Sequence, residues 1–348
     1  MKKPLPRKYK NPFAVSPAKT KTSNFDVLTI GAATRDVFVQ SSRFKNIKDP
    51  AAPDGLDACF PLGAKIDLNN VVFETGGGAT NAAVTFARFG LKTACVARVG
   101  KDPGGKEIKK KLTNEGIDTS YIQTDDKQCT GYSFILVSDT GQRAILVYRG
   151  ASAKIDAKLI DWKRIKPEWI YLTSLAGDET LLKKVFLEAK KSGARIVWNP
   201  GNAELHLGHK KLTPYLLQCD ILLLNREEAA ALVNLPPRHL DEITHALGTL
   251  PRQAIVITDG ANGAYMHSHG ATWYAPALPG KRVNTTGAGD AFGSAFAAGA
   301  IKTGNLEKAF RAGMLNAFGV ITHMGAKAGI LKKFPPSQDL RRVKVKKI

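Results

Sequence analysis

The segment TLLKKVFLEAKKSGARIVW (residues 180–198) is typical of a helix that leads directly into a buried strand. Residues 180–193 have the pattern of an amphipathic helix, and Gly193 at their end favours a helix C-terminus. Apart from Arg195, the run ARIVW that follows is apolar at every position rather than alternating. Strands of this kind are usually covered on both faces by helices.

The same alternation of apolar strand and helix continues on both sides of this segment. Strands are predicted at residues 26–30, 93–99, 220–224 and 254–258, and helices at 107–116, 227–233, 240–248, 288–302 and 306–323. This order predicts an α/β fold with a doubly wound, mostly parallel sheet. Ligands of such sheets bind beyond the carboxyl ends of the strands, so the residues that follow each strand are candidate site residues.

Two regions depart from this alternation. Residues 36–44 and 65–74 are predicted to be β segments without an intervening helix, and residues 131–150 a hairpin that turns at 139–141. We expect them to form a small β-sheet lid over the site, from about 36–75 and 130–150. The breaks within residues 46–63 predict a loop insertion.

Length and charge suggest one domain with basic ends. The chain has 348 residues, 43% of them hydrophobic, and a formal charge of +21. Residues 1–21 contribute +7 and residues 331–348 contribute +6, which leaves +8 for the remainder. We expect a disordered basic tail at 1–24, a domain at 25–330 and a mobile, solvated basic tail at 331–348.

This charge distribution favours an anionic small substrate over nucleic acid as the partner, although binding of nucleic acid through the tails is an alternative. No apolar run approaches the roughly 20 residues that a membrane helix needs, and no secretory signal is evident. The four cysteines are widely spaced and form no CxxC pair. Together these features predict reduced thiols and a cytoplasmic protein without a membrane partner.

The sequence TTGAGDAF (285–292) contains the clearest candidate for chemistry. Two glycines precede a helix of small residues, so the backbone N–H groups of Gly287, Ala288 and Gly289 could bind an anion. Asp290 in the first turn could accept the proton of an attacking hydroxyl. A tight turn in which Asp290 only interacts with the helix dipole is the structural alternative.

A second glycine-rich sequence, ETGGGATNAA (74–83), also precedes a helix. Gly77 and Gly78 would let a ligand approach the backbone, and Asn81 could hydrogen-bond to hydroxyl groups. Asp36 follows the first strand and could bind sugar hydroxyls as well. A flexible turn explains the glycines alone equally well.

Two further segments follow buried strands. The glycines of TDGANG (258–263) suit a nucleotide lying on the backbone, although a plain turn explains them nearly as well. Asn225 and Glu228 form the pattern of a capping box. The alternative is that Glu228 acts near Mg²⁺ and phosphate through water.

GKDPGGK (100–106) matches the first part of a P-loop but is not expected to be one. Glu107 stands where a P-loop needs Ser or Thr, and Pro103 removes a backbone donor. The GAGDAFG sequence likewise lacks the spacing of a dinucleotide-binding fingerprint.

Taken together, the GGGATNAA, VGKDPGG and TTGAGDAF sequences resemble the ribokinase-like (PfkB) carbohydrate kinases in order and separation, over about residues 26–330. The resemblance implies a doubly wound domain with a β lid, ATP and Mg²⁺ as cofactors, and in-line phosphoryl transfer. It implies that Asp290 is the general base and that the backbone of 287–289 forms the anion hole. The residues that it places at the sugar are Asp36, Gly77, Gly78 and Asn81, and those at ATP are Asn225, Glu228, Thr258, Gly260, Gly263 and Asn316.

Two positions depart from the family pattern. Asn284 stands where many relatives have an Asp that helps to hold a monovalent cation, so activation by such a cation is open. Thr34 replaces the Asn that ribokinases tend to have, so ribose is not assured.

The acceptor is therefore expected to be a small sugar or sugar-like molecule. Tyr148-Arg149 resembles the sugar-acid kinases, and Arg149 could pair with a carboxylate or phosphate. An adenosine-like nucleoside is an alternative, for which Phe38, Phe60 and Phe134 could provide an aromatic platform. A catalytically silent sugar-binding protein on the same fold is a further alternative. The protein could also form a homodimer.

Overall fold

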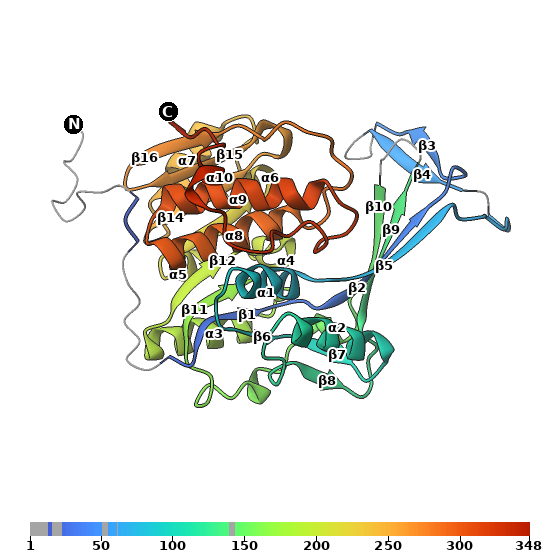
Figure 1. The fold of residues 1–348 in the computed structure, drawn as a ribbon, viewed down its shortest axis with the longest axis horizontal. Helices are drawn as coiled ribbons and strands as arrows, with labels where there is room; N and C mark the ends of the chain where they lie inside the picture. The colour runs from blue at the N-terminus through green and yellow to red at the C-terminus, as the bar shows by residue number, and fades with distance from the viewer. Residues whose placement is uncertain (1–12, 16–22, 51–54, 61, 139–142) are drawn as a thin grey trace.

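The computed structural model describes residues 13–15, 23–50, 55–60, 62–138 and 143–348. A nine-stranded sheet forms its centre, helices cover both faces of the sheet, and a separate small sheet stands at one side (Figure 1). This arrangement confirms the predicted α/β fold with a mostly parallel sheet.

The order of the large sheet is β17-β16-β15-β14-β13-β12-β11-β1-β6. The strands from β14 to β6 are parallel to their neighbours, whereas β15, β16 and β17 pair antiparallel at one edge. The strand bounds are β1 Phe25–Ile30, β6 Thr93–Val96, β11 Pro167–Leu172, β12 Arg195–Trp198, β13 Ile221–Asn225, β14 Ala254–Thr258, β15 Ala264–Ser268, β16 Ala271–Ala275 and β17 Lys346–Lys347.

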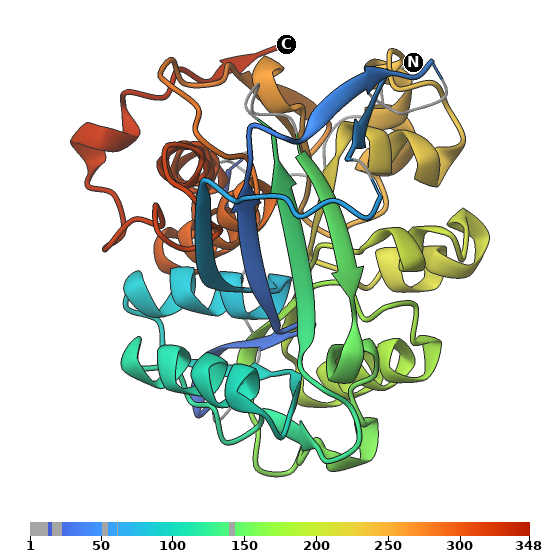
Figure 2. The ribbon, with the colours of Figure 1, turned by 90° about the vertical axis from the view of Figure 1, so that its right-hand side faces the viewer.

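Two helical layers enclose the large sheet, and they flank the lid when the molecule is viewed from the lid side (Figure 2). The first contains α1 (Gly78–Arg88), α2 (Pro103–Asn114), α8 (Ala288–Thr303) and α9 (Leu306–Ile321), with the short α10 (Ser337–Leu340) beside α9. The second contains α3 (Glu179–Ser192), α4 (Asn202–Leu205), α5 (His209–Leu216), α6 (Arg226–Val233) and α7 (Leu240–Gly248).

The continuously apolar strands are explained by these two layers. In β13, Leu222 and Leu224 belong to the hydrophobic core beneath α3, α5, α6 and α7. Ile221 and Leu223 point the other way, into the core beneath α1, α8 and α9. Because successive side chains of a strand alternate between faces, burial of both faces requires an apolar residue at every position.

The small sheet has the order β10-β9-β2-β5 and confirms the predicted β lid as a separate unit. Its strands are β2 (Thr34–Gln40), β5 (Asn70–Gly76), β9 (Gly131–Val137) and β10 (Arg143–Tyr148). β2 continues from β1 through three residues, so the lid rises from the carboxyl end of the parallel sheet (Figure 1). The predicted turn at 139–141 lies outside the described residues.

Two local predictions were wrong. Residues 46–63 are not only a loop, because β3 (Lys45–Lys48) pairs antiparallel with β4 (Leu56–Cys59), and Pro50 and Gly55 lie between the strands. The strand predicted at 93–99 is divided after Val96, because β7 (Arg98–Gly100) leaves the large sheet to pair with β8 (Gln123–Asp125).

The prediction of a mobile, solvated tail at 331–348 was also wrong. Leu340 and Val343 are buried in the core beneath α9, at 4% and 0% exposure. β17 pairs with β16, and the Arg311 guanidinium donates to the carbonyl oxygen of Val343. Apolar residues therefore anchor this segment to the domain, and its basic side chains lie between them.

Most of the predicted tail at 1–24 lies outside the described residues. Its described part, 13–15, contacts the domain: the rings of Phe13 and Trp273 lie 4.9 Å apart, and the Leu306 N–H donates to the Phe13 carbonyl oxygen at 2.8 Å.

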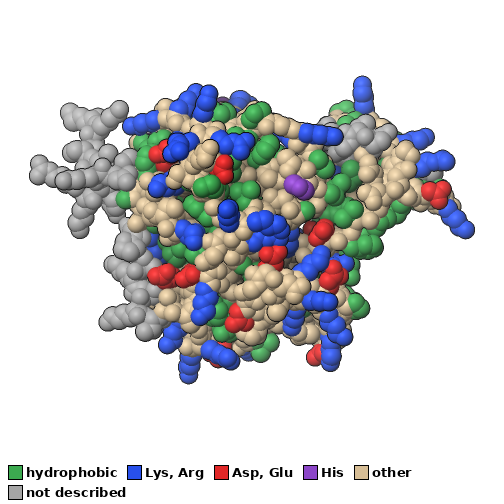
Figure 3. Space-filling view, in the orientation of Figure 1, with side chains coloured by type: hydrophobic (Ala, Val, Ile, Leu, Met, Phe, Trp, Pro, Cys, Tyr) green, Lys and Arg blue, Asp and Glu red, His purple; other side chains and the backbone are tan. Residues whose placement is uncertain are grey.

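Lys and Arg side chains are spread over much of the face shown in Figure 3, with acidic side chains among them. All four cysteines are free, so no disulfide contributes to stability. Within the described part of the chain, no helix has the length and apolar character needed to cross a membrane.

The buried C-terminal segment leads to a stability prediction. Val343→Ala should lower the free energy of unfolding by about 2 kcal/mol, because it removes fully buried methyl groups and leaves a cavity. Val345→Ala is the matched control, since Val345 is only partly buried and should cost less than about 1 kcal/mol. Urea unfolding followed by circular dichroism measures both values. Equal, negligible effects would show that this segment does not pack in solution.

Candidate functional site

The N-terminus of α8 opens onto a cavity that contains a carboxylate. Gly287 begins this helix with φ of 80°, and a Cβ there would overlap Ala326, so the turn requires glycine. Asp290 lies in the first turn and lines a cavity of about 250 Å³ together with Glu228. Desolvation by burial raises the pKa of Asp290. The carboxylate therefore faces a cavity beside backbone groups that can attract an anion.

The predicted anion hole is partly engaged in the turn itself. The Ala288 N–H donates to the Thr285 carbonyl oxygen at 3.2 Å. Gly289 has no atom within 4 Å of the position that a Cβ would take, so its backbone is open toward the cavity. Asn284 is buried, and its Oδ1 accepts from the Thr286 N–H at 2.7 Å, which fixes the start of the turn.

The first turn of α1 meets the first turn of α8. The Asn81 side chain donates through Nδ2 to Asp290 Oδ2 at 2.8 Å, and this bond favours the ionised carboxylate. Asn81 is 4% exposed. Gly77 precedes α1 with φ of 93°, which few residues other than glycine adopt. The two glycine-rich sequences found by sequence analysis thus lie together in the structure.

Asp36 lies on β2 near this junction and is 5% exposed. Thr34 Oγ1 donates to Asp36 Oδ1 at 3.1 Å, and a Cβ at Gly76 would overlap the Asp36 carboxylate. Burial raises the pKa of Asp36, while the charge of Lys327 lowers it. Gly76 was not among the predicted site residues, although it belongs to the same glycine run.

Lys327 is the principal residue that sequence reasoning missed. Its Nζ donates to the Thr75 carbonyl oxygen at 2.5 Å, to Thr80 Oγ1 at 2.9 Å and to Asn81 Oδ1 at 2.5 Å. Burial lowers the pKa of this lysine to about 8, and the charges of Asp36 and Asp290 oppose the shift. A single lysine in the segment after α9 carries no motif signal, so only the fold reveals this contact.

A larger pocket of about 510 Å³ adjoins the cavity that contains Asp290, because both are lined by Asn225, Thr258, Gly289 and Phe292. Gly260 and Gly263 line it from one side, and Met314, Ala317 and Phe318 of α9 line it from another. Its size and its mixture of apolar walls, glycines and polar groups fit a nucleotide. The predicted residues Asn225, Thr258, Gly260 and Gly263 therefore lie at one pocket.

The Asn225-Glu228 capping box is formed. Asn225 Oδ1 accepts from the Glu228 N–H at 2.7 Å, and Glu228 Oε2 accepts from the Asn225 N–H at 2.8 Å. Glu228 also lines the cavity with Asp290, and burial raises its pKa. The structural alternative considered for this pair is thus confirmed, and it coexists with a position next to the cavity.

The structure does not place Asn316, which was predicted to line the adenine pocket, among the residues that line the nucleotide-sized pocket. Asn316 is fully buried and does not reach the nucleotide-sized pocket. Its Nδ2 donates to the Ala291 carbonyl oxygen at 2.8 Å, and its Oδ1 accepts from the Leu331 N–H at 2.9 Å. Asn316 instead joins α9 to α8 and to the segment after Lys327.

Two arginines of the lid differ in position. Arg143, at the start of β10, lines the nucleotide-sized pocket and donates to Thr285 Oγ1. It was not predicted, and it connects the lid with the turn before α8. Arg149 follows β10 and is exposed, and its carbonyl oxygen accepts from Ser152 Oγ at 2.8 Å.

Phe38 is one of the three residues predicted to form an aromatic platform for a nucleoside. It is instead buried in the lid with Ile135 and Val137.

The GKDPGGK sequence has a structural role. Asp102 caps α2, because its carboxylate accepts from the Gly105 N–H at 2.8 Å and from the Thr130 N–H at 2.7 Å. Its side chain thus occupies the helix N-terminus that would bind phosphate in a P-loop.

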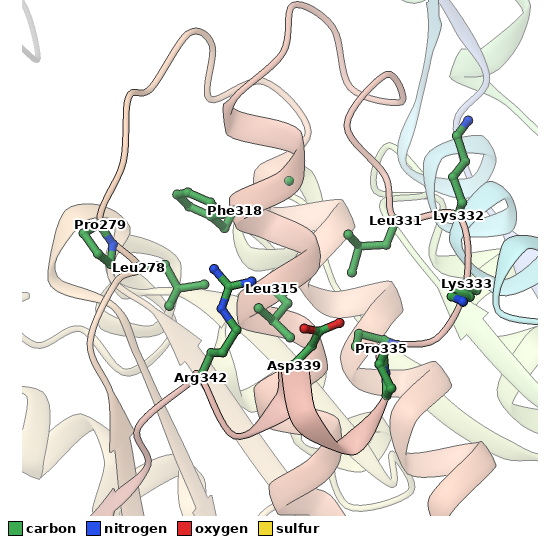
Figure 4. A pocket seen from close by; sticks show the side chains of 12 residues that line it. Leu278, Pro279, Leu315, Phe318, Leu331, Lys332, Lys333, Pro335, Asp339 and Arg342 are labelled. Carbon is green, nitrogen blue, oxygen red and sulfur yellow. The ribbon is translucent and has the colours of Figure 1, made fainter.

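A further pocket of about 400 Å³ lies against α9 and the C-terminal segment (Figure 4). It shares Leu278 and Phe318 with the nucleotide-sized pocket. Arg342 and Asp339 lie near its centre (Figure 4). Asp290 and Glu228 do not line it, so it is not part of the candidate active site.

In the described part of the chain, no three His, Cys, Asp or Glu side chains gather to hold a metal ion. Glu228 and Asp290 nevertheless provide two carboxylates at one cavity. Oxygen ligands of this kind suit Mg²⁺ that is bound mainly by substrate phosphates and water.

Comparisons with known proteins agree with this geometry. The pfkB family carbohydrate kinases match residues 55–333. Ribokinase of Haemophilus influenzae is 29% identical over 277 residues, which cover 77% of this chain and 88% of that protein. The structure of Arabidopsis thaliana ribokinase complexed with ribose and ATP has a TM-score of 0.73 at 20% identity, and covers 92% of this chain and 98% of its own. Adenosine kinase from Sinorhizobium meliloti has a TM-score of 0.74 at 20% identity, over 89% and 98% of the two chains.

The family match extends over most of the chain and contains the glycine-rich junction, the Asp290 cavity and most of the lid. The protein therefore belongs to the pfkB family of carbohydrate kinases, which transfer a phosphoryl group to an alcohol group of a sugar.

Proposed function

We propose that the protein transfers the γ-phosphoryl group of ATP to a hydroxyl group of a small sugar or sugar-like acceptor, with Asp290 as the general base. The observation that carries this proposal is the position of Asp290: it lies in the first turn of α8 and lines a cavity next to a nucleotide-sized pocket. An acceptor hydroxyl in that cavity would lie between the base and the γ-phosphate.

The reaction is an in-line displacement. The acceptor oxygen forms a bond to the γ-phosphorus, the bond to the oxygen that bridges the β- and γ-phosphates breaks, and Asp290 takes the hydroxyl proton. ADP and the phosphorylated acceptor are the products. The N–H groups at 287–289 and the positive end of the α8 dipole would stabilise the charge on the transferred group.

The other predicted residues have roles on the two sides of this point. On the acceptor side we propose that Asp36, Asn81 and the backbone of Gly77 and Gly78 bind hydroxyls, and that Arg149 binds an acidic group where the acceptor has one. On the nucleotide side, Asn225, Thr258, Gly260 and Gly263 would bind ATP. Mg²⁺, when bound, neutralises phosphate charge, and Glu228 would hold water next to it.

The similarity to ribokinase and adenosine kinase supports a sugar or nucleoside as the acceptor class, in agreement with the site. Free thiols and the use of ATP suit a cytoplasmic location.

An acceptor screen tests the proposed reaction. Purified protein with γ-³²P-labelled ATP and Mg²⁺ should label at least one of ribose, fructose 1-phosphate, fructose 6-phosphate, 2-keto-3-deoxygluconate and adenosine. The label is followed by thin-layer chromatography. Labelling of adenosine alone would indicate a nucleoside kinase. Absence of labelling with every acceptor, at normal ATP affinity, would favour a silent sugar-binding protein.

Asp290→Asn should reduce kcat by about 10²–10⁴-fold while ATP affinity stays close to that of the wild type, since the change removes a proton acceptor without changing the side-chain size. Steady-state kinetics and isothermal titration calorimetry measure the two quantities. Asp126→Asn is the matched control, because Asp126 is exposed, forms an ion pair with Lys101 and does not line the cavity that contains Asp290. An unchanged kcat in Asp290→Asn would remove Asp290 from the role of base.

Glu228→Ala should raise the Mg²⁺ concentration needed for half-maximal activity more than it raises the KM of the acceptor. The reason is that Glu228 lines the cavity from the nucleotide side, whereas the acceptor residues lie on α1 and β2. Because this change also breaks the capping box, Glu228→Gln is measured beside it as a variant that can keep the hydrogen bond. A larger effect on acceptor KM than on Mg²⁺ dependence would contradict the assignment.

A further inference from the structure

Lys327 is a cation inside the protein, at 8% exposure. Its three hydrogen bonds go to oxygens of Thr75, Thr80 and Asn81, all of which are uncharged. An ammonium group has three N–H donors and no acceptor, so every donor is used. A buried charge with only neutral bonded partners is costly to maintain, which calls for an explanation beyond packing.

The segment that carries Lys327 is held in place from two helices. Arg88 of α1 donates to the Ile330 carbonyl oxygen at 2.9 Å, and Asn316 of α9 accepts from the Leu331 N–H at 2.9 Å. Arg88 also forms an ion pair with Glu115 at 2.5 Å. The ammonium group is therefore presented to the site by a fixed backbone.

The contact with Asn81 determines which way its amide group points. Because Lys327 can only donate, the atom of Asn81 that faces it must be the oxygen, and the distance of 2.5 Å agrees with this assignment. The amide nitrogen must then face Asp290, to which it donates at 2.8 Å. A chain of two hydrogen bonds thus leads from a buried cation to the carboxylate that lines the cavity.

Without the charge of Lys327, the repulsion between the carboxylates near these two hydrogen bonds would be less compensated. Asp36 and Asp290 are both desolvated, the charge of Asp36 further raises the pKa of Asp290, and the charge of Glu74 further raises the pKa of Asp36. The positive charge of Lys327 lowers the pKa of both carboxyl groups. The groups that interact electrostatically with Lys327 are Asp36 of β2, Glu74 of β5, Cys95 of β6, Lys111 of α2, Glu115 after α2 and Asp290 of α8.

We propose that Lys327 is a positioning residue for the phosphoryl transfer, and that through Asn81 and its own charge it keeps Asp290 ionised and holds its carboxylate in a fixed orientation. This role rests on the proposed function of Asp290. Lys327 itself touches neither substrate in this scheme. It acts on the base through Asn81 of α1.

A titration of the carboxyl groups tests the proposal without any substrate. The ligand-free protein is labelled with ¹³C at the aspartate carboxyl groups, and the Asp290 signal is assigned by its loss in Asp290→Asn. In Lys327→Met the midpoint of this signal should move to higher pH than in the wild type. Lys184→Met, which removes a half-exposed lysine paired with Glu188 on α3, should leave the midpoint unchanged.

The pH profile of kcat/KM gives a second readout, with the acceptor that the screen labels best. Its acid limb should move to higher pH in Lys327→Met by the same amount as the carboxyl signal, with a loss of roughly tenfold for each pH unit below the midpoint.

A purely structural lysine would give a different result. Lys327→Met would then lower activity or stability equally at every pH and leave the Asp290 midpoint in place, which would overturn the proposal. If Lys327→Met does not fold, Lys327→Gln provides the same test, because its amide can still donate to Asn81 without a charge. A wild-type midpoint in a folded Lys327→Gln protein would likewise overturn the role of the charge.

The two proposals fail in different ways. Full turnover by Asp290→Asn would refute the general base, whatever the carboxyl titration of Lys327→Met shows. Loss of turnover in Asp290→Asn together with an unmoved Asp290 midpoint in Lys327→Met would refute only the role of Lys327.

Discussion

The hydrogen bond between Asn81 and Asp290 joins the first turns of two helices whose residues lie 209 positions apart in the chain. α1 follows β5 of the lid and α8 follows β16 of the large sheet, and the two helices pack against each other in one layer. Close approach of the two turns depends on residues without bulky side chains: Gly287 accommodates Ala326, and Gly76 accommodates the Asp36 carboxylate. The site therefore depends on backbone geometry at a few glycines, more than on long side chains that reach across a cleft.

This geometry brings acidic groups together where water is largely excluded. Burial raises the pKa of Asp36, Glu228 and Asp290, so each is less readily ionised than a surface carboxylate. A general base needs an ionised form that still has appreciable affinity for a proton, and partial burial provides such a compromise. The N–H of Asn81 and the charge of Lys327 limit the shift of Asp290.

The fold was largely predictable because its cause is local. Continuously apolar runs such as 221–224 indicate burial on both faces, and Gly193 marks a helix end, whatever the rest of the chain does. The C-terminal segment was misjudged because its basic residues outnumber the apolar ones. Leu340 and Val343 were the available signal, since two apolar residues three positions apart are enough to anchor a short segment against α9. The antiparallel pairing of β3 with β4 depends on tertiary placement of weak strands, which sequence pattern does not specify.

For the site, motif sequences located the glycines, Asp290 and the Asn225-Glu228 pair, but not the residues that orient them. Lys327 and Asn316 lie outside those motifs and gain their contacts only when α1, α8 and α9 pack. Asn316 illustrates how the two kinds of residue are connected: its amide bonds to Ala291, next to Asp290, and to Leu331, four residues beyond Lys327. This fully buried amide therefore links the helix that carries the base to the segment that carries the lysine. Its position in the core, away from the nucleotide-sized pocket, thus gives Asn316 a physical reason to matter for the chemistry without touching either substrate.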